Sequence, residues 1–239
     1  MKENLTELVL ILDRSGSMSS IRDDAMGSVN SFLDDQKKVE GSANVTLCQF
    51  DDEFDIIHDC VDLQNVPSLT PETFVPRGST ALFDAIGRTV NQVGARLGST
   101  DEKDRPSNVI VAIITDGGEN ASKEFTKSQI FEMVTEQESK YNWEFIYLSS
   151  DIKASQDAVS YGFKSKSIAV MDTGGEAYRG GTMSVSSYVS ETRMVGKDAN
   201  SYTLQNLVDG AVVEKRISDS VLPNTTASGT ITDSSGTPD

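Results

Sequence analysis

The sequence predicts an α/β fold of the doubly wound, Rossmann-like class, a three-layer sandwich built on a mostly parallel sheet of six strands. Two observations support this prediction. Residues 8–12 and 109–114 are unbroken aliphatic runs, which are typical of strands buried on both faces of a parallel sheet. Strand-like and helical patterns then alternate along the chain, which is the order that βα units produce.

The first half of the chain contains a buried strand, a helix and a hairpin. The strand at residues 8–12 ends at Asp13, and Ile21, Ala25 and Val29 then share one face of a helix. Residues 44–50 and 54–61 have the character of strands, and the three residues between them are too few for a crossover helix. We therefore expect an antiparallel hairpin at a sheet edge, with residues 51–53 as a solvated turn.

The second half repeats the alternation of helix and strand. The apolar spacing predicts helices from Leu82 onward and at residues 127–140, 154–161 and 176–194, and strands at residues 109–114, 143–148 and 167–170. Trp143, Phe145 and Tyr147 alternate on one strand face, which predicts packing against a helix. Residues 1–195 thus form one domain. Residues 196–239 are rich in Ser, Thr, Asp and Gly, and we expect a polar C-terminal tail that becomes ordered only against a partner.

Composition narrows the classes of partner. The 239 residues include 37 Asp and Glu against 21 Lys and Arg, a net charge of −16, which repels nucleic acids and anionic membranes. The early apolar run is too short for a signal peptide or a membrane span, so we expect a bacterial or host cytoplasm, with a virion as the alternative. Cys48 and Cys60 lie on neighbouring predicted strands; a disulfide between them stays open, and free thiols are favoured.

Oxygen-bearing side chains gather where the aliphatic strands end. Asp13, Ser15 and Ser17 alternate directly after the first strand, Asp116 follows the strand at residues 109–114, and Thr80 precedes a helix. Ligands of doubly wound sheets bind beyond the carboxyl ends of the strands, where strand order reverses. Two carboxylates and three hydroxyls, without a cluster of Cys or His, suit Mg²⁺, with Mn²⁺ or Ca²⁺ as alternatives.

Each of these residues also has an ordinary structural explanation. Ser15, Ser17 and Thr80 precede helices and could cap them, and Asp116 before two glycines is a common turn residue. The joint placement of five oxygen donors at sites that the βα topology brings together favours the metal site.

The pattern Asp13-x-Ser15-x-Ser17, then Thr80, then Asp116-Gly117 resembles the metal-ion-dependent adhesion site (MIDAS) of von Willebrand factor A domains, over about residues 5–195. Residues 8–18, 77–86, 115–122 and 143–148 are similar to stand-alone bacterial and bacteriophage proteins of that family. The resemblance implies a sheet of order 3-2-1-4-5-6 with an antiparallel edge strand, and Mg²⁺ held by hydroxyls directly and by carboxylates directly or through water. Glu119 and Asn120 depart from the motif, and the tail matches no part of it.

Three functions are compatible with such a site. The favoured one is a non-enzymatic module that binds a protein partner by capturing a partner carboxylate on Mg²⁺. The second is a structural or assembly component, as in a bacteriophage virion, that docks permanently onto other subunits. The third is a Mg²⁺-dependent phosphohydrolase with Asp13 as nucleophile, which Ser15 disfavours because a second Asp, the general acid, is wanted there. A serine hydrolase is weaker still, since His58 is the sole histidine.

Overall fold

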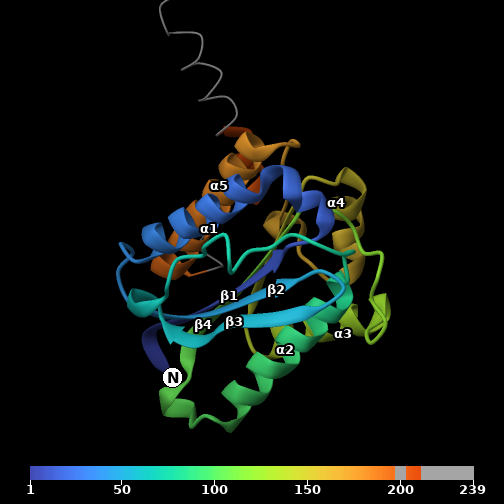
Figure 1. Cartoon of the computed structure of the whole chain (residues 1–239). Coiled ribbons are helices and arrows are strands. Elements are labelled where there is room, and N and C mark those ends of the chain that lie inside the picture. The colour runs from blue at the N-terminus through green and yellow to red at the C-terminus, as the bar shows by residue number, and fades with distance from the viewer. Residues whose placement is uncertain (197–202, 211–239) are drawn as a thin grey trace, which may run out of the picture.

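Six strands form one sheet in the order β3-β2-β1-β4-β5-β6 in the computed structural model, which describes residues 1–196 and 203–210 (Figure 1). The strands are β1 (Lys2–Asp13), β2 (Ser42–Phe50), β3 (Phe54–Asp62), β4 (Pro106–Thr115), β5 (Glu144–Ser149) and β6 (Ile168–Val170). Every neighbouring pair is parallel except β2 with β3, which is antiparallel. The predicted fold class, strand order and antiparallel edge strand are therefore confirmed.

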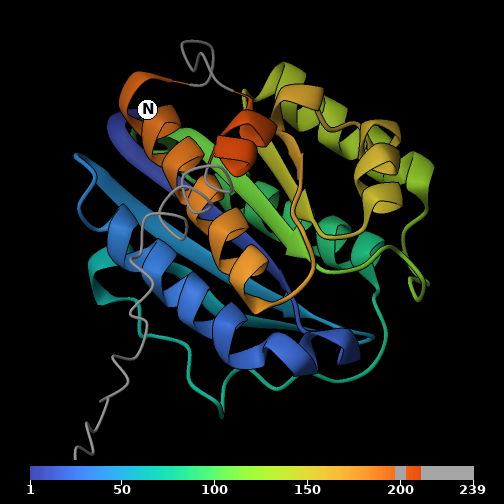
Figure 2. The same ribbon diagram turned by 90° about the horizontal axis from the view of Figure 1, so that it is seen from above.

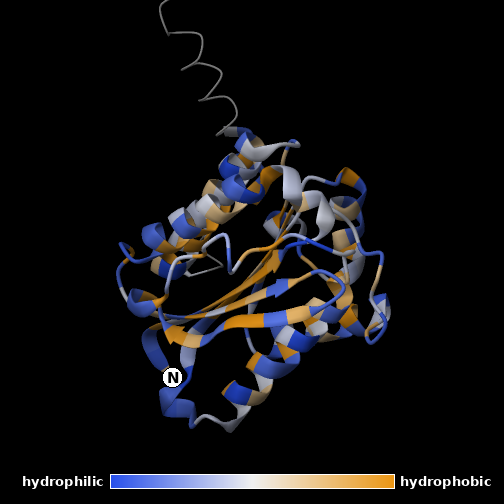
Figure 3. Cartoon of the chain, viewed as in Figure 1, coloured by the Kyte–Doolittle hydropathy of each residue, from blue (hydrophilic) through white to orange (hydrophobic). Residues whose placement is uncertain are grey.

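Helices cover both faces of the sheet. They are α1 (Arg22–Gln36), α2 (Leu82–Ser99), α3 (Lys127–Lys140), α4 (Ile152–Ala158) and α5 (Gly175–Val195). Helices α1 and α5 lie side by side on one face, and α2 and α3 cover the other (Figure 2). Leu8, Leu10 and Leu12 belong to the buried cluster beneath α1 and α5, whereas Val9 and Ile11 belong to the cluster beneath α2 and α3. The strands are correspondingly the most apolar part of the molecule (Figure 3).

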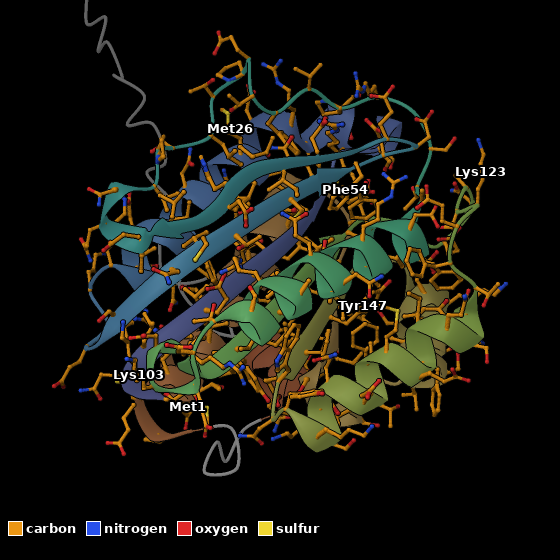
Figure 4. All side chains as sticks on the ribbon, turned by 90° about the horizontal axis from the view of Figure 1, so that it is seen from below. Met1, Met26, Phe54, Lys103, Lys123 and Tyr147 are labelled. Carbon is orange, nitrogen blue, oxygen red and sulfur yellow. The ribbon has the colours of Figure 1, made fainter. Side chains whose placement is uncertain are left out.

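The aromatic face of β5 packs as expected. Trp143 and Phe145 stack with ring centroids 6.1 Å apart, and Tyr147 meets Phe163 at 5.4 Å. These residues are buried in the cluster beneath α2 and α3. Figure 4 shows Tyr147 between the sheet and these helices. The face is core, so it offers no platform for a ligand.

Several boundaries differ from the predicted ones. Strand β1 begins at Lys2, well before the aliphatic run, because its exposed first residues still pair through the backbone, as in the 2.8 Å hydrogen bond from Lys2 N to Arg105 O. Helix α4 ends at Ala158, and a 3-10 turn continues to Tyr161.

Cys48 and Cys60 are both free thiols. No helix within the described ranges is long and apolar enough to cross a bilayer.

Residues 204–210, assigned above to the polar tail, form a short helix against the domain. Leu204 is 0% exposed and Val208 is 5% exposed, and both join the cluster beneath α1 and α5. The side-chain amide of Gln205 accepts a hydrogen bond from Val170 N at 2.8 Å and donates one to Val170 O at 3.2 Å. The buried core thus extends past residue 195, while residues 197–202 and 211–239 of the expected tail lie outside the described residues.

This packing predicts that Leu204→Ala lowers the free energy of unfolding by about 2–4 kcal/mol, because the substitution removes fully buried methyl groups and leaves a cavity. Denaturant unfolding measures the loss. Met194→Ala, at a residue that is 63% exposed, is the control and should change stability by less than about 0.5 kcal/mol. Equal stability of the Leu204 variant and wild type would contradict the observed packing.

Candidate metal centre

The predicted donors lie where β1 and β4 end, side by side in the middle of the sheet. Asp13 is the last residue of β1, and Asp116 directly follows the last residue of β4. Strand order reverses between these two strands, because β1 continues to β2 on one side and to β4 on the other. Loops emerging from a reversal point diverge and leave a crevice above the sheet. We refer to this end of the sheet as the carboxyl pole.

Four of the five predicted residues form one chain of hydrogen bonds. Ser15 N donates to Asp13 Oδ1 at 2.6 Å, and the hydroxyls of Ser15 and Ser17 are 3.1 Å apart. The Ser17 hydroxyl donates to Asp116 Oδ1 at 2.8 Å. The structure therefore brings the first and third parts of the motif, 99 residues apart in sequence, into direct contact.

Thr80 is held at the same place by its backbone. Thr80 N donates to Asn120 Oδ1 at 2.9 Å, and Thr80 O accepts from Asn120 N at 3.0 Å. A Cβ built on Gly117 would lie 3.8 Å from Thr80 Oγ1, so the threonine hydroxyl faces the loop that carries Asp116. Thr80 thus lies beside the loop that carries Asp116.

Helix capping does not account for these hydroxyls. The 3-10 turn Gly16–Ile21 has Ser15 at its N-cap without a side-chain hydrogen bond, and the N-cap of α1 is Ile21, also without one. Helix α2 has Ala81 as its N-cap, also without one. The N–H groups at the start of α2 are instead bound by the loop that follows β4, since Phe83 N donates a hydrogen bond to Glu119 Oε2 at 2.9 Å. The serine and threonine hydroxyls are left for another role.

An ion-pair cluster holds the loops around the donors. Asp51, which is 0% exposed, accepts hydrogen bonds from Arg14 Nε at 3.0 Å and Arg77 Nε at 2.8 Å. Arg14 lies in the loop that carries Ser15 and Ser17, Asp51 follows β2, and Arg77 lies in the loop that carries Thr80. These two loops, together with the loop of Asp116, are the donor loops. The expectation that residues 51–53 form a solvated turn is wrong for Asp51, because two arginines from neighbouring loops converge on its carboxylate and exclude water.

Two glycines allow the donor loops to touch. Gly16 N donates to Gly78 O at 3.1 Å, and a Cβ on Gly16 would lie 3.3 Å from that oxygen. Gly78 has φ +64°, and a Cβ there would lie 1.8 Å from Asp52 Oδ1. The positive φ strains any other residue at position 78, and a Cβ there would also displace the exposed Asp52 side chain, so glycine is favoured where the loop passes this close to the turn after β2.

Burial makes the charged forms of Asp13 and Asp116 unfavourable. Asp13 is fully buried, and its Oδ2 accepts a 2.5 Å hydrogen bond from the Thr115 hydroxyl. Burial raises the pKa of Asp13 to about 6, although the hydrogen bonds from Thr115 and Ser15 oppose the rise and the charge of Asp116 adds to it. Burial also raises the pKa of Asp116. A cation placed between these carboxylates would relieve this cost.

The donor set fits a hard divalent cation. Within the described ranges no cluster of three or more His, Cys, Asp or Glu side chains is arranged to hold a metal, so a centre here depends on hydroxyl oxygens as well as on Asp13 and Asp116. Oxygen donors of this kind suit Mg²⁺, Mn²⁺ or Ca²⁺. Asp13, Ser15 and Thr80 are buried, whereas Ser17 is exposed and Asp116 partly exposed, so the site opens on one side.

Sequence reasoning missed the residues that support the donors. Thr115 could have been found, because it ends β4 beside Asp13 in parallel register. Arg14, Asp51 and Arg77 carried no such signal, since arginines and aspartates in loops are usually solvated. Glu119 and Asn120 depart from the family pattern, and here they bind the backbone of residues 83 and 80.

Known proteins resemble the chain in structure rather than in sequence. No protein-family profile and no curated protein matches the sequence. The pilus adhesin SpaC from Lactobacillus rhamnosus GG superposes with a TM-score of 0.58 at 12% identity, over 80% of this chain and 31% of SpaC. Proximal thread matrix protein 1 from the mussel byssus superposes with a TM-score of 0.53 at 12% identity, over 79% of this chain and 47% of that protein.

The chain therefore spans less than half of the length of either of these proteins. The structural neighbours include von Willebrand factor A domains, the mussel protein among them. The six-stranded sheet of this chain, with its order β3-β2-β1-β4-β5-β6 and one antiparallel pair, matches the Rossmann-like fold of these domains. The chain has the fold of the von Willebrand factor A family.

Proposed function

We propose that the protein is a non-enzymatic binding module that holds a divalent cation, Mg²⁺ in the first place, with Asp13, Ser15, Ser17, Thr80 and Asp116. The observation that carries the proposal is the convergence of these residues at the carboxyl pole, with two carboxylates at raised pKa and hydroxyls that cap no helix. When bound, the ion supplies a coordination position for a carboxylate of a protein partner.

The exposure of the donors supports capture of a partner from solvent. Ser17 and Asp116 form the open side of the site, while the Arg14–Asp51–Arg77 cluster keeps the donor loops in place from behind. The acidic chain as a whole repels a carboxylate, so attraction has to be local to the cation. This combination favours a partner whose acidic residue reaches into the crevice.

Assembly is the second candidate. Two of the structural neighbours are named as a pilus adhesin and as a thread matrix protein of the mussel byssus. Pili and byssus threads are extended assemblies. A component of such an assembly, including a bacteriophage virion, would use the same fold for permanent docking. Docking through another face would not depend on the cation.

The phosphohydrolase alternative finds less support. That chemistry needs a general acid two residues after the nucleophile, and Ser15 stands there with its hydroxyl against Ser17. Among the described residues, no lysine contacts Asp13 or Ser15, and the sole histidine lies in the middle of edge strand β3. The site geometry favours binding over catalysis.

A cation titration followed by partner capture tests the proposal. Calorimetry with Mg²⁺, Mn²⁺ and Ca²⁺ should show one site in the wild type, and Asp13→Ala should weaken binding by more than about 100-fold, because a principal carboxylate is lost. Capture of a partner from the native source should disappear with chelator and with Asp13→Ala alike. Asp101→Ala, on an exposed side chain, is the matched control.

Two outcomes would overturn the proposal. If the partner is captured equally well with chelator present and by the Asp13→Ala variant, the partner docks elsewhere, and permanent assembly is favoured. Phosphatase activity that is lost in Asp13→Asn would favour the enzyme.

A further inference from the structure

Asn120 joins the loop that carries Asp116 to the loop that carries Thr80. Its side-chain Oδ1 accepts a hydrogen bond from Thr80 N at 2.9 Å, and its backbone N donates one to Thr80 O at 3.0 Å. Ala121 N donates a second hydrogen bond to Thr80 O at 3.2 Å. Both polar backbone groups of Thr80 are therefore held by the loop of Asp116.

The Thr80 hydroxyl depends on these backbone contacts for its position. Thr80 is 4% exposed, and its hydroxyl faces Gly117, the residue after Asp116. The two serine hydroxyls and the Asp116 carboxylate are joined by side-chain hydrogen bonds, whereas the Thr80 hydroxyl makes none within the described part of the chain. Threonine is branched at Cβ and has few side-chain rotamers, so the backbone of Thr80 determines where its hydroxyl points.

Glu119, the other departure from the family pattern, anchors the loop of Asp116 on α2. Its Oε2 accepts hydrogen bonds from Phe83 N in the first turn of α2, at 2.9 Å, and from the Ser122 hydroxyl, at 2.6 Å. Its Oε1 accepts hydrogen bonds from the backbone N–H groups of residues 121 and 122, at 2.9 and 2.7 Å. Each carboxylate oxygen thus has two donors, and Asn120 meets Thr80 from a loop whose backbone is held in place.

We propose that Asn120 is a positioning residue of the metal centre. Its side chain fixes the Thr80 hydroxyl relative to the loop of Asp116, so that these two donors meet the cation as one rigid unit. The inference rests on the proposed function. Groups that hold metal ligands in place typically change metal affinity about 10–100-fold when they are removed. Asn120 is neutral, so its removal changes the geometry of the site and leaves the charge around the cation unchanged.

Asn120→Ala tests the role because it removes the side-chain acceptor and keeps the backbone hydrogen bonds to Thr80 O. We expect affinity for Mg²⁺ and for Mn²⁺, measured by calorimetry, to fall about 10–100-fold. In the metal-free protein the Thr80 amide should exchange its hydrogen faster than in the wild type, while the amides of β1 and β4 keep their wild-type rates.

Asn120→Asp is the rescue variant, because it keeps an oxygen at the position of Oδ1. It should restore both the cation affinity and the slow exchange of the Thr80 amide. The exchange rate in the metal-free protein is the deciding result, since the added charge of an aspartate also attracts the cation. Fast exchange in Asn120→Asp would contradict the role of this acceptor.

Ser122→Ala is the matched control in the same loop. The Ser122 hydroxyl accepts a hydrogen bond from Asp84 N at 3.1 Å and donates one to Glu119, so it fastens the loop to α2 rather than to Thr80. This variant should lose some stability and keep wild-type cation affinity. Unchanged affinity in Asn120→Ala, or an equal loss in Asn120→Ala and Ser122→Ala, would overturn the inference. A wild type that binds no cation would instead overturn the proposed function.

Discussion

Replacing Asp51 with alanine is expected to lower the free energy of unfolding by about 3 kcal/mol, because it leaves the buried guanidinium of Arg14 with only the half-exposed carboxylate of Asp55, 2.6 Å away, as a counter-charge. The Asp51 and Arg14 side chains are 0% and 7% exposed, so water cannot replace the lost partner. Arg77 is half exposed and contributes less to this loss. Chemical denaturation at pH 7 measures the change.

Asp52→Ala is the natural control, because it removes the same kind of side chain from the next residue. Asp52 is exposed and accepts one long hydrogen bond, from Ser79 N at 3.3 Å. Its removal should cost less than about 1 kcal/mol. Similar losses for the two variants would show that the ion-pair cluster is not what holds the donor loops together.

Asp13→Asn is expected to stabilise the metal-free protein at pH 7 by about 1–3 kcal/mol and to abolish its stabilisation by Mg²⁺. The pKa of Asp13 is raised from 3.8 to about 6 in the folded protein. Between these values the folded state holds a proton that the unfolded state has released, so stability falls as the pH rises through this window. Above about pH 6 the folded state carries the full cost, about 3 kcal/mol, and the uncharged amide avoids it.

The measurement is unfolding at pH 4 and pH 7, with chelator and with Mg²⁺. In chelator, the variant should gain on the wild type as the pH rises, part of the gain being offset by the weaker hydrogen bonds of an amide to Ser15 N and Thr115. With Mg²⁺ at 100 times its dissociation constant, the wild type alone should gain about 2.7 kcal/mol. Equal gains in the wild type and in the variant would mean that Asp13 holds no cation.

The fold was largely predictable because its signals are local. Buried parallel strands require unbroken aliphatic segments, and residues 8–12 and 109–114 have them. The start of β1 was not predictable, since Lys2 pairs through its backbone and its side chain carries no strand signal. The packing of Leu204 and Val208 was missed for a related reason: a few apolar residues in a polar segment do not reveal which surface they cover.

The residues of the candidate site also fall into those that the sequence predicts and those that it does not. Its five donors follow or precede predicted elements, so topology alone was enough to gather them. Asp51 reaches the loop after Asp13 through the register of β2 beside β1, in which Asp13 pairs with Phe50. Contacts between residues this far apart in the sequence have no local sequence pattern that predicts them.

The Gln205 amide has a consequence for how partners can attach. By offering one acceptor and one donor to Val170, it imitates a single residue of a seventh strand and occupies the backbone N–H and C=O of Val170, at the end of β6, that an incoming chain would need. The opposite edge, β3, carries Asp55 and Asp59 with exposed side chains, which disfavour a flat apolar pairing there. Growth of the sheet by strand addition is thus discouraged at both ends, which leaves the carboxyl pole and the helical faces for recognition.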